Sequence, residues 1–220
     1  MGSRNGVTLS AGARHRPGCD FPTEGYRRRG RPYAGNAATQ LSVPVRQCAR
    51  RLMFPDGSVD FVHMRMLVSA IPHDRWPFVV SELARVTGPG GWVESVEAIL
   101  PVNGGPVAER LMDWIRAISA RRGVEIQDAM KVSDLMRAAG LRNVSRRETR
   151  IPCGAYGGRV GKLMTTDYFA GVRAIRGVVV AQGLATEEQF DWALEQALRD
   201  LDSPQYQCYM PVYIATGQRM

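Results

Sequence analysis

Three side chains that could contact a ligand stand together at the end of a short apolar run. The run Val59 to Met64 predicts a buried strand, which His63, Met64 and Arg65 close. Ligands of open α/β sheets bind beyond the carboxyl ends of the strands, so we expect these three residues at a binding edge. Arg65 could pair with a carboxylate or make an ordinary surface ion pair. His63 could contact the ligand or make a structural hydrogen bond at the strand end.

Other kinds of catalytic centre lack their sequence signals. The four cysteines form no Cys-x-x-Cys pair and the three histidines do not cluster with them, which favours free thiols over a zinc site or a disulfide framework. Neither an HExxH helix nor a phosphate-binding Gly-x-x-x-x-Gly-Lys-Ser/Thr loop occurs. We therefore expect no metal site. The cysteines and histidines concerned are Cys19, Cys48, Cys153, Cys208, His15, His63 and His73.

Strands and helices alternate from Leu52 onward, after the turn Asp56-Gly57-Ser58. This alternation predicts an α/β fold, in which helices cover both faces of a largely parallel sheet. The predicted strands cover residues 59–64, 92–99, 141–151 and 207–216. The predicted helices are one capped by Asp74 and ended by Gly88 to Gly91, one around residues 107–118, one from Ser133 to Gly140, one over 159–182, and one after a Thr186–Gln189 capping box. Three glycines, Gly161, Gly171 and Gly177, argue against an unbroken helix over 159–182.

Aromatic residues in these elements have two interpretations. We expect Trp76 and Trp92 to pack in the core rather than to form a platform for a substrate. Four later aromatics could line a pocket for a substrate, and helix packing explains them equally well: Trp114, Tyr156, Tyr168 and Phe169.

Two runs together resemble class I S-adenosylmethionine-dependent methyltransferases. The run Phe54 to Arg65 resembles the fourth sheet strand of that family with its entering turn, and Ser81 to Glu94 resembles its "E-L-x-R-V-x-x-P-G-G" signature. Residues 133–141 and 206–217 resemble the helix before its sixth strand and its closing strand. The resemblance covers residues 52–220 and implies a Rossmann-like class I methyltransferase sheet with helices on both faces, incomplete at the N-terminus.

The resemblance implies a cofactor and a reaction. The cofactor is S-adenosylmethionine, and His63, Met64 and Arg65 match the family positions that face its methionine end. The reaction needs neither a metal nor a covalent nucleophile, because the sulfonium is already activated. The methyl acceptor would be a small molecule, bound by variable late helices, and its identity and acceptor atom stay open.

The segment 1–51 differs sharply from the rest. It holds ten arginines and two acidic residues, so the whole net charge of +8 belongs to it and residues 52–220 are neutral. The Gly-x-Gly-x-Gly loop and the ribose-binding acid that the family has upstream are missing. Its Arg, Gly and Pro content predicts disorder, with a short strand near Leu41 as one exception. We expect 1–51 to be disordered or aberrant, as an out-of-frame or wrongly started product, with a genuine extension as the alternative, and 52–220 to be a partial methyltransferase domain.

Two functions follow. The first is a methyltransferase acting on a small molecule, truncated or inactive as written unless the missing cofactor-binding half is compensated. The alternative is a non-catalytic methyltransferase-like remnant, whose basic arm binds RNA or an acidic partner by charge. Nucleic acid is not expected to bind the neutral domain. No apolar run suits a membrane span or a signal peptide, so the expected location is the cytoplasm.

Overall fold

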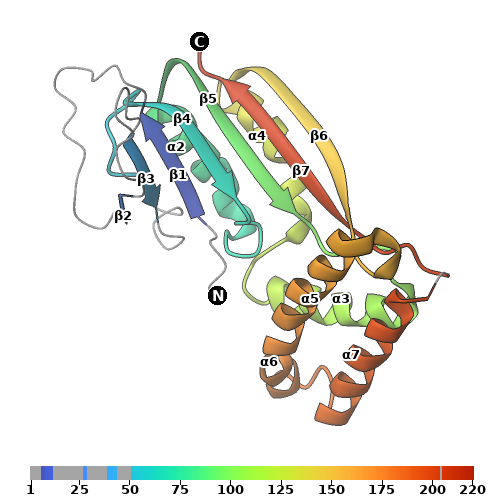
Figure 1. Cartoon of the computed structure of the whole chain (residues 1–220). Helices are drawn as coiled ribbons and strands as arrows, with labels where there is room; N and C mark the ends of the chain where they lie inside the picture. Colours follow the sequence, from blue (N-terminus) through green and yellow to red (C-terminus); the bar gives the residue numbers. More distant parts are fainter. Residues whose placement is uncertain (1–5, 12–26, 29–38, 44–50, 204) are drawn as a thin grey trace. The chain divides into compact units, whose positions relative to one another are not determined.

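The computed structural model describes residues 6–11, 27–28, 39–43, 51–203 and 205–220 (Figure 1). Contacts divide the chain into two compact units. Unit 1 comprises Met1–Glu97, Gln127–Arg147 and Tyr213–Met220, and unit 2 comprises Ala98–Ile126 and Glu148–Val212. The division falls inside three strands, β5 (Thr87–Ala98), β6 (Arg142–Pro152) and β7 (Tyr209–Gln218).

The described strands form one sheet in the order β2-β3-β1-β4-β5-β7-β6. At its centre β4 (Val59–Arg65) pairs in parallel with β5, which sets Phe61 opposite Trp92 and His63 opposite Glu94. This parallel pair confirms the arrangement on which the predicted fold depends. At one end of the order lies β6, an edge strand that carries exposed arginines in unit 1: Arg142, Arg146 and Arg147.

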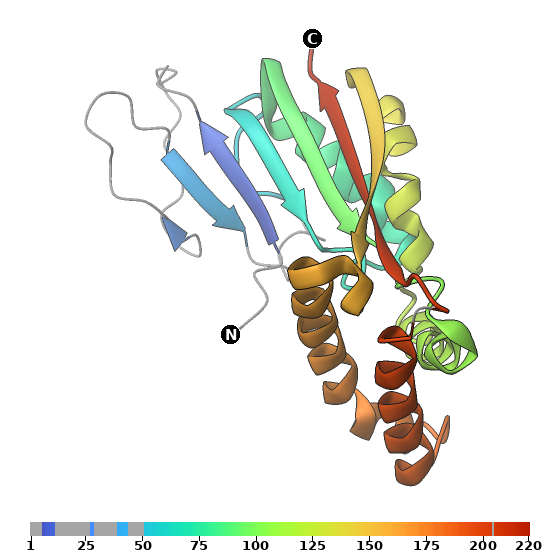
Figure 2. The ribbon, with the colours of Figure 1, turned by 45° about the vertical axis from the view of Figure 1, so that its right-hand side comes forward.

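Two helices of unit 1, α2 (Trp76–Val86) and α4 (Val132–Ala138), pack against each other on the same face of the sheet (Figure 2). The caps predicted for these two helices, Asp74 and Ser133, were wrong. Asp74 lies within the 3₁₀ turn His73–Arg75, and α2 starts at Trp76 because the proline that follows suits the first helical turn. Ser133 is a buried residue inside α4.

Unit 2 holds the helices α3 (Gly105–Ala120), α5 (Gly158–Ala174), α6 (Arg176–Ala181) and α7 (Glu187–Leu201), with the 3₁₀ turn Ala155–Gly157 before α5. The predicted Thr186–Gln189 capping box starts α7 as expected. The stretch 159–182 is helical as expected, and the interruption that its glycines suggested occurs at Ile175, which separates α5 from α6. Glycines near the break lower helix propensity. Helices α3 and α7 pack together, with Trp114 stacked on Phe190 at 5.7 Å between ring centroids.

Three strands lie within segment 1–51. They are β1 (Gly6–Ala11), β2 (Arg27–Arg28) and β3 (Thr39–Val43), and β3 matches the short strand expected near Leu41. Strand β1 pairs antiparallel with both β3 and β4. The expected sheet was largely parallel, so the antiparallel strand β1 beside β4 is a difference. The prediction that 1–51 is disordered or aberrant falls mainly on residues outside the described part and stays a prediction.

Arg85 fixes the turn that leads into β4. Its guanidinium donates to both carboxylate oxygens of Glu82 at 2.8 and 2.9 Å, to Asp56 Oδ1 at 2.6 Å, and to the carbonyl oxygens of Phe54 and Leu52. Glu82 in turn accepts the Leu52 amide hydrogen at 2.8 Å. These bonds lower the pKa of both carboxyl groups and raise the pKa of Arg85. The Glu and Arg of the E-L-x-R signature therefore bind the start of the strand that precedes their own helix.

We predict that Arg85→Ala lowers the free energy of unfolding in urea by about 3 kcal/mol, because it leaves the nearly buried Glu82 carboxylate without its cation. The matched control is Arg137→Ala, since Arg137 is an exposed arginine on α4 paired with Asp134; it should cost less than about 1 kcal/mol. Adding Glu82→Gln to Arg85→Ala should recover part of the loss. Equal losses in the two single variants would contradict the assigned role.

Candidate functional site

Side chains alternate along β4 between the buried face of the sheet and the opposite face. Val62 and Met64 are fully buried, whereas Phe61, His63 and Arg65 are partly or well exposed. Two of the three predicted ligand residues, His63 and Arg65, thus share an accessible face at the carboxyl end of the strand. Met64 sits between them with its side chain in the core, so only its backbone belongs to this edge.

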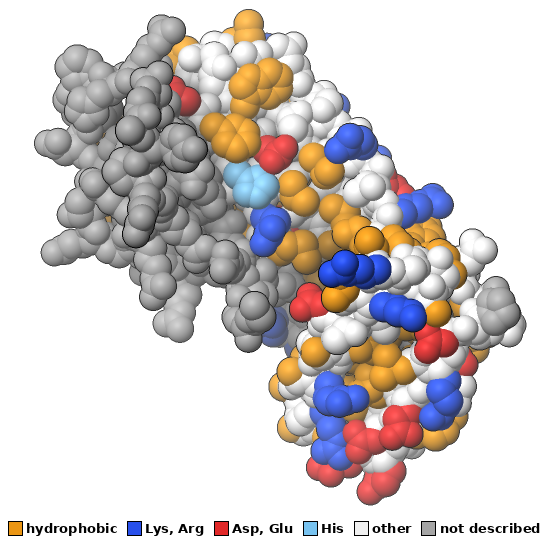
Figure 3. Space-filling model, viewed as in Figure 1, with side chains coloured by type: hydrophobic (Ala, Val, Ile, Leu, Met, Phe, Trp, Pro, Cys, Tyr) orange, Lys and Arg blue, Asp and Glu red, His pale blue; other side chains and the backbone are white. Residues whose placement is uncertain are grey.

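His63 is held by an acidic residue of the next strand. Its Nδ1 lies 2.8 Å from Oε1 of Glu94, and each side chain is about 30% exposed. The parallel register sets the two residues opposite each other. Phe61 stacks on the imidazole of His63 at 6.5 Å between ring centroids. The register sets Trp92 opposite Phe61, and Trp92 is partly exposed. Figure 3 shows hydrophobic, acidic, histidine and basic side chains gathered on this face.

Sequence reasoning missed Glu94. The available signal was the alternation Trp92, Glu94, Val96 in the predicted second strand, which sets these residues on one face. Two alternating strands do not reveal their mutual register, and register decides that Glu94 meets His63 rather than another residue.

A buried glutamate shapes the turn after β4. Glu97 Oε2 accepts the amide hydrogens of Leu67 and Val68 at 2.8 and 2.9 Å. The turn begins at Met66, whose φ of 54° is in the left-handed region that non-glycine residues rarely adopt. Glu97 is completely buried, and its Oε1 has no hydrogen-bond partner among the described residues. Burial raises its pKa to about 7. Glu97 thus holds the backbone that directly follows Arg65, and sequence reasoning missed it too.

Backbone conformation explains Gly90 in β5, and close backbone approach explains Gly91. A Cβ on Gly91 would lie 2.7 Å from the carbonyl oxygen of Asp60 in β4, and Gly90 has a φ of 80°. Any larger residue at position 91 would push β5 away from β4. The Pro-Gly-Gly turn therefore contributes to the site by keeping His63 and Glu94 on strands that can pair.

The edge at the carboxyl end of β4 suits a ligand that carries one negative and one positive charge. Arg65 offers an exposed cation for a carboxylate, and Glu94 with the rings of Phe61 and His63 offers a surface for a cationic group. The family resemblance assigns this edge to the methionine end of S-adenosylmethionine, and that assignment stays a prediction. No described residue supplies a Gly-rich loop for its nucleoside end. Within the described ranges, His, Cys, Asp and Glu nowhere gather in groups of three suited to a metal ion.

The predicted aromatic residues have different surroundings. In unit 1, Trp76 is buried in the core as expected, but Trp92 is 38% exposed, so its core assignment was wrong. In unit 2, Tyr168 donates a hydrogen bond to Met112 Sδ at 3.1 Å and meets Phe169 edge to face. Burial raises the pKa of Tyr168. These contacts support helix packing.

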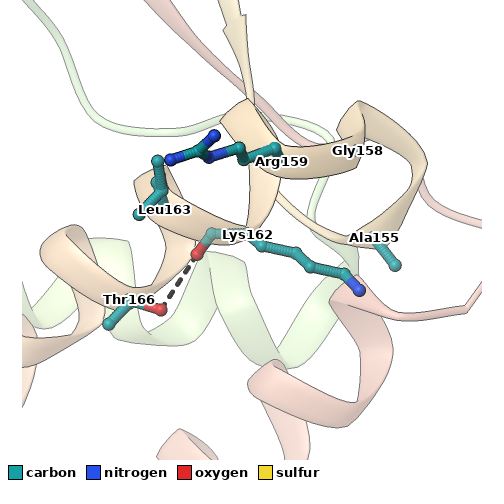
Figure 4. A pocket seen from close by; sticks show the side chains of 6 residues that line it. All are labelled: Ala155, Gly158, Arg159, Lys162, Leu163 and Thr166. Carbon is teal, nitrogen blue, oxygen red and sulfur yellow. Dashed lines mark hydrogen bonds between the residues drawn. The ribbon is translucent and has the colours of Figure 1, made fainter.

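A shallow hollow lies on α5 in unit 2. Its volume is about 430 Å³, and Figure 4 shows Arg159 and Lys162 extending in different directions from its wall. Ala155, Gly158, Leu163 and Thr166 complete the lining. The hydroxyl of Thr166 donates to the carbonyl oxygen of Lys162 and is thereby satisfied within the helix. The hollow is cationic and open.

We predict a pH-dependent stability difference between the parent protein and Glu97→Gln. In the unfolded chain Glu97 ionises near its ordinary pKa of 4.5, but in the folded protein it ionises only near pH 7. The parent protein therefore loses stability relative to the glutamine variant as the pH rises through this window, by up to about 3 kcal/mol. Urea denaturation at several pH values measures the difference, which should be constant below pH 4.5. A pH-independent difference would refute the burial argument.

Comparison with known proteins places this geometry in a family. The family model described as "Methyltransferase domain" matches residues 3–146, a range that includes most of segment 1–51. The "N-methyltransferase tcpN" of Claviceps purpurea (strain 20.1) is 30% identical over 174 residues, which cover 74% of this chain and 60% of that protein. The chain thus spans about 60% of the length of this curated relative.

Two of the solved structures with some likeness to this chain are those of methyltransferases. The phosphoethanolamine N-methyltransferase 2 of Haemonchus contortus is 10% identical, with a TM-score of 0.41 over 76% of this chain and 34% of that one. The geranyl diphosphate C-methyltransferase of Streptomyces coelicolor A3(2) is 13% identical, with a TM-score of 0.37 over 79% and 51%. The family model covers well over half of the chain, and its match agrees with the motifs and with the parallel β4–β5 pair. The chain therefore belongs to the methyltransferase-domain family, the class I group that uses S-adenosylmethionine.

Proposed function

We propose that this protein transfers a methyl group from S-adenosylmethionine to a small molecule, and that the edge formed by His63, Met64 and Arg65 binds the methionine end of the cofactor. The observation that carries the proposal is the 2.8 Å contact between His63 and Glu94 on two parallel strands, directly beside the exposed Arg65. Ligands bind at the carboxyl ends of such strands, and charges prepared there before binding need little rearrangement.

The relatives support the kind of reaction. The curated relative is an N-methyltransferase, and the solved structures include enzymes bound to phosphomonomethylethanolamine and geranyl diphosphate. Each of these acceptors is a small molecule, and they differ widely in chemistry. We therefore propose a small-molecule acceptor of unspecified class. Because the chain covers only part of the curated relative, the activity of the whole protein is also a proposal.

Each residue at the edge has a distinct task in this proposal. Arg65 binds the cofactor's carboxylate through its guanidinium. Glu94 fixes the orientation of the His63 ring through its contact with Nδ1. Glu97 holds the turn behind Arg65 in one conformation. The bound cofactor supplies an activated methyl group, and these residues supply orientation and shielding from water.

The alternative is a methyltransferase-like chain without catalysis, in which the basic segment 1–51 binds RNA or an acidic partner. Two observations favour it: the net charge of +8 belongs to that segment, and no described residue forms a Gly-rich cofactor loop. Binding by charge alone weakens steeply with salt, whereas cofactor binding at the β4 edge depends on single residues.

We predict that isothermal titration of the full chain with S-adenosylmethionine shows micromolar binding, which Arg65→Ala weakens by about 10- to 100-fold through loss of one charge-assisted hydrogen bond. Arg137→Ala removes the same charge from α4 and should leave the affinity unchanged. Glu94→Gln should weaken binding less than Arg65→Ala, because the amide still holds His63 and only the negative charge beside the rings is lost.

Two results would reject the proposal. One is the absence of cofactor binding together with salt-sensitive binding of a polynucleotide, which supports the alternative. The other is equal weakening by Arg65→Ala and Arg137→Ala, which would show a general charge effect in place of a site at the end of β4.

A further inference from the structure

Two buried cysteines of unit 2 stand next to each other in space, although 54 residues separate them in the sequence. Cys153 directly follows β6 and Cys208 directly precedes β7. The amide of Cys153 donates to the carbonyl oxygen of Cys208 at 2.8 Å, and both residues are at most 2% exposed. The hydroxyl of Tyr156 donates to the same carbonyl oxygen at 2.6 Å. Two donors thus hold the carbonyl group of Cys208 in place beside Cys153.

The two thiols also affect each other's ionisation: the neighbouring Cys208 lowers the pKa of Cys153, whereas the neighbouring Cys153 and burial raise the pKa of Cys208. The backbone hydrogen bond keeps the two residues on adjacent segments, and a disulfide joins residues whose Cα atoms are about 4.4 to 6.8 Å apart. The structure holds both as free thiols.

We propose that Cys153 and Cys208 are a site of reversible disulfide formation with hydrogen peroxide as the oxidant. The thiolate of Cys153 attacks one peroxide oxygen, which gives a sulfenic acid and, after protonation of the leaving hydroxide, water. The thiol of Cys208 then attacks the sulfenic sulfur, the S–S bond forms, and a second water leaves. Two electrons pass from the pair of sulfurs to the peroxide, and an added dithiol reverses the change.

The position of the pair gives the bond a structural effect. The chain between the two cysteines contains α5, α6 and α7, so the disulfide closes this helical segment into a covalent loop. Closing a long loop removes conformational freedom from the unfolded chain and stabilises the folded unit. The contacts that hold the pair already exist in the reduced protein, so oxidation needs no rearrangement of β6 or β7.

The test treats the full chain with hydrogen peroxide and maps its peptides by mass spectrometry without reduction. We expect one cross-linked species that joins the peptides of Cys153 and Cys208, with a loss of about 2 Da for the two thiol hydrogens and recovery by dithiothreitol. The oxidised protein should melt several degrees higher than the reduced one, by roughly 5 °C or more. Cys153→Ser and Cys208→Ser should each abolish both effects.

Cys19→Ser with Cys48→Ser is the matched control, since it removes the other two thiols and should leave the cross-link intact. Cross-links that involve Cys19 or Cys48, separate oxidation of Cys153 and Cys208 to sulfinic acids, or no change in mass would each overturn the proposal. Peptide mapping of the parent protein decides the matter even where a serine variant fails to fold. None of these readouts depends on cofactor binding.

Discussion

The guanidinium of Arg85 joins the helix α2 to the turn that precedes β4, and the position of the candidate site depends on this contact. A largely buried arginine and a largely buried glutamate would be costly apart, but each satisfies the other, and the remaining donors bind the backbone of Leu52 and Phe54. The strand that follows then starts at a fixed residue. Because side chains alternate along a strand, this start decides that His63 and Arg65 face outward and Met64 inward.

Much of the architecture could be predicted because its signals are local. The turn before Val59, the glycines before Trp92 and the capping box at Thr186 each act through neighbours within a few residues, and the corresponding elements formed. The methyltransferase resemblance rested on the same local runs. The helix expected over 159–182 is interrupted at Ile175. Local signals are weak here, because the glycines of this stretch have a low helix propensity, and packing against other elements determines where the helix ends.

The parts of the candidate site that sequence reasoning missed depend on contacts between distant residues. Glu94 meets His63 only through strand register, and Glu97 reaches back by about thirty positions to hold the amides of Leu67 and Val68. The partial exposure of Trp92 likewise depends on which helices cover its face, and the two helices of unit 1 lie on the same side. Hydrophobicity and propensity describe single residues, so they carry no information about such partners.

The arginines of β6 have a consequence for how copies of this protein meet. An edge strand presents unpaired amide and carbonyl groups, to which a strand of another molecule could add. A second copy that approached through β6 would bring its own arginines against Arg142, Arg146 and Arg147, and this like-charge repulsion opposes growth of the sheet from molecule to molecule. Salt weakens that protection, so concentrated, high-salt solutions are where two copies become able to pair through this edge.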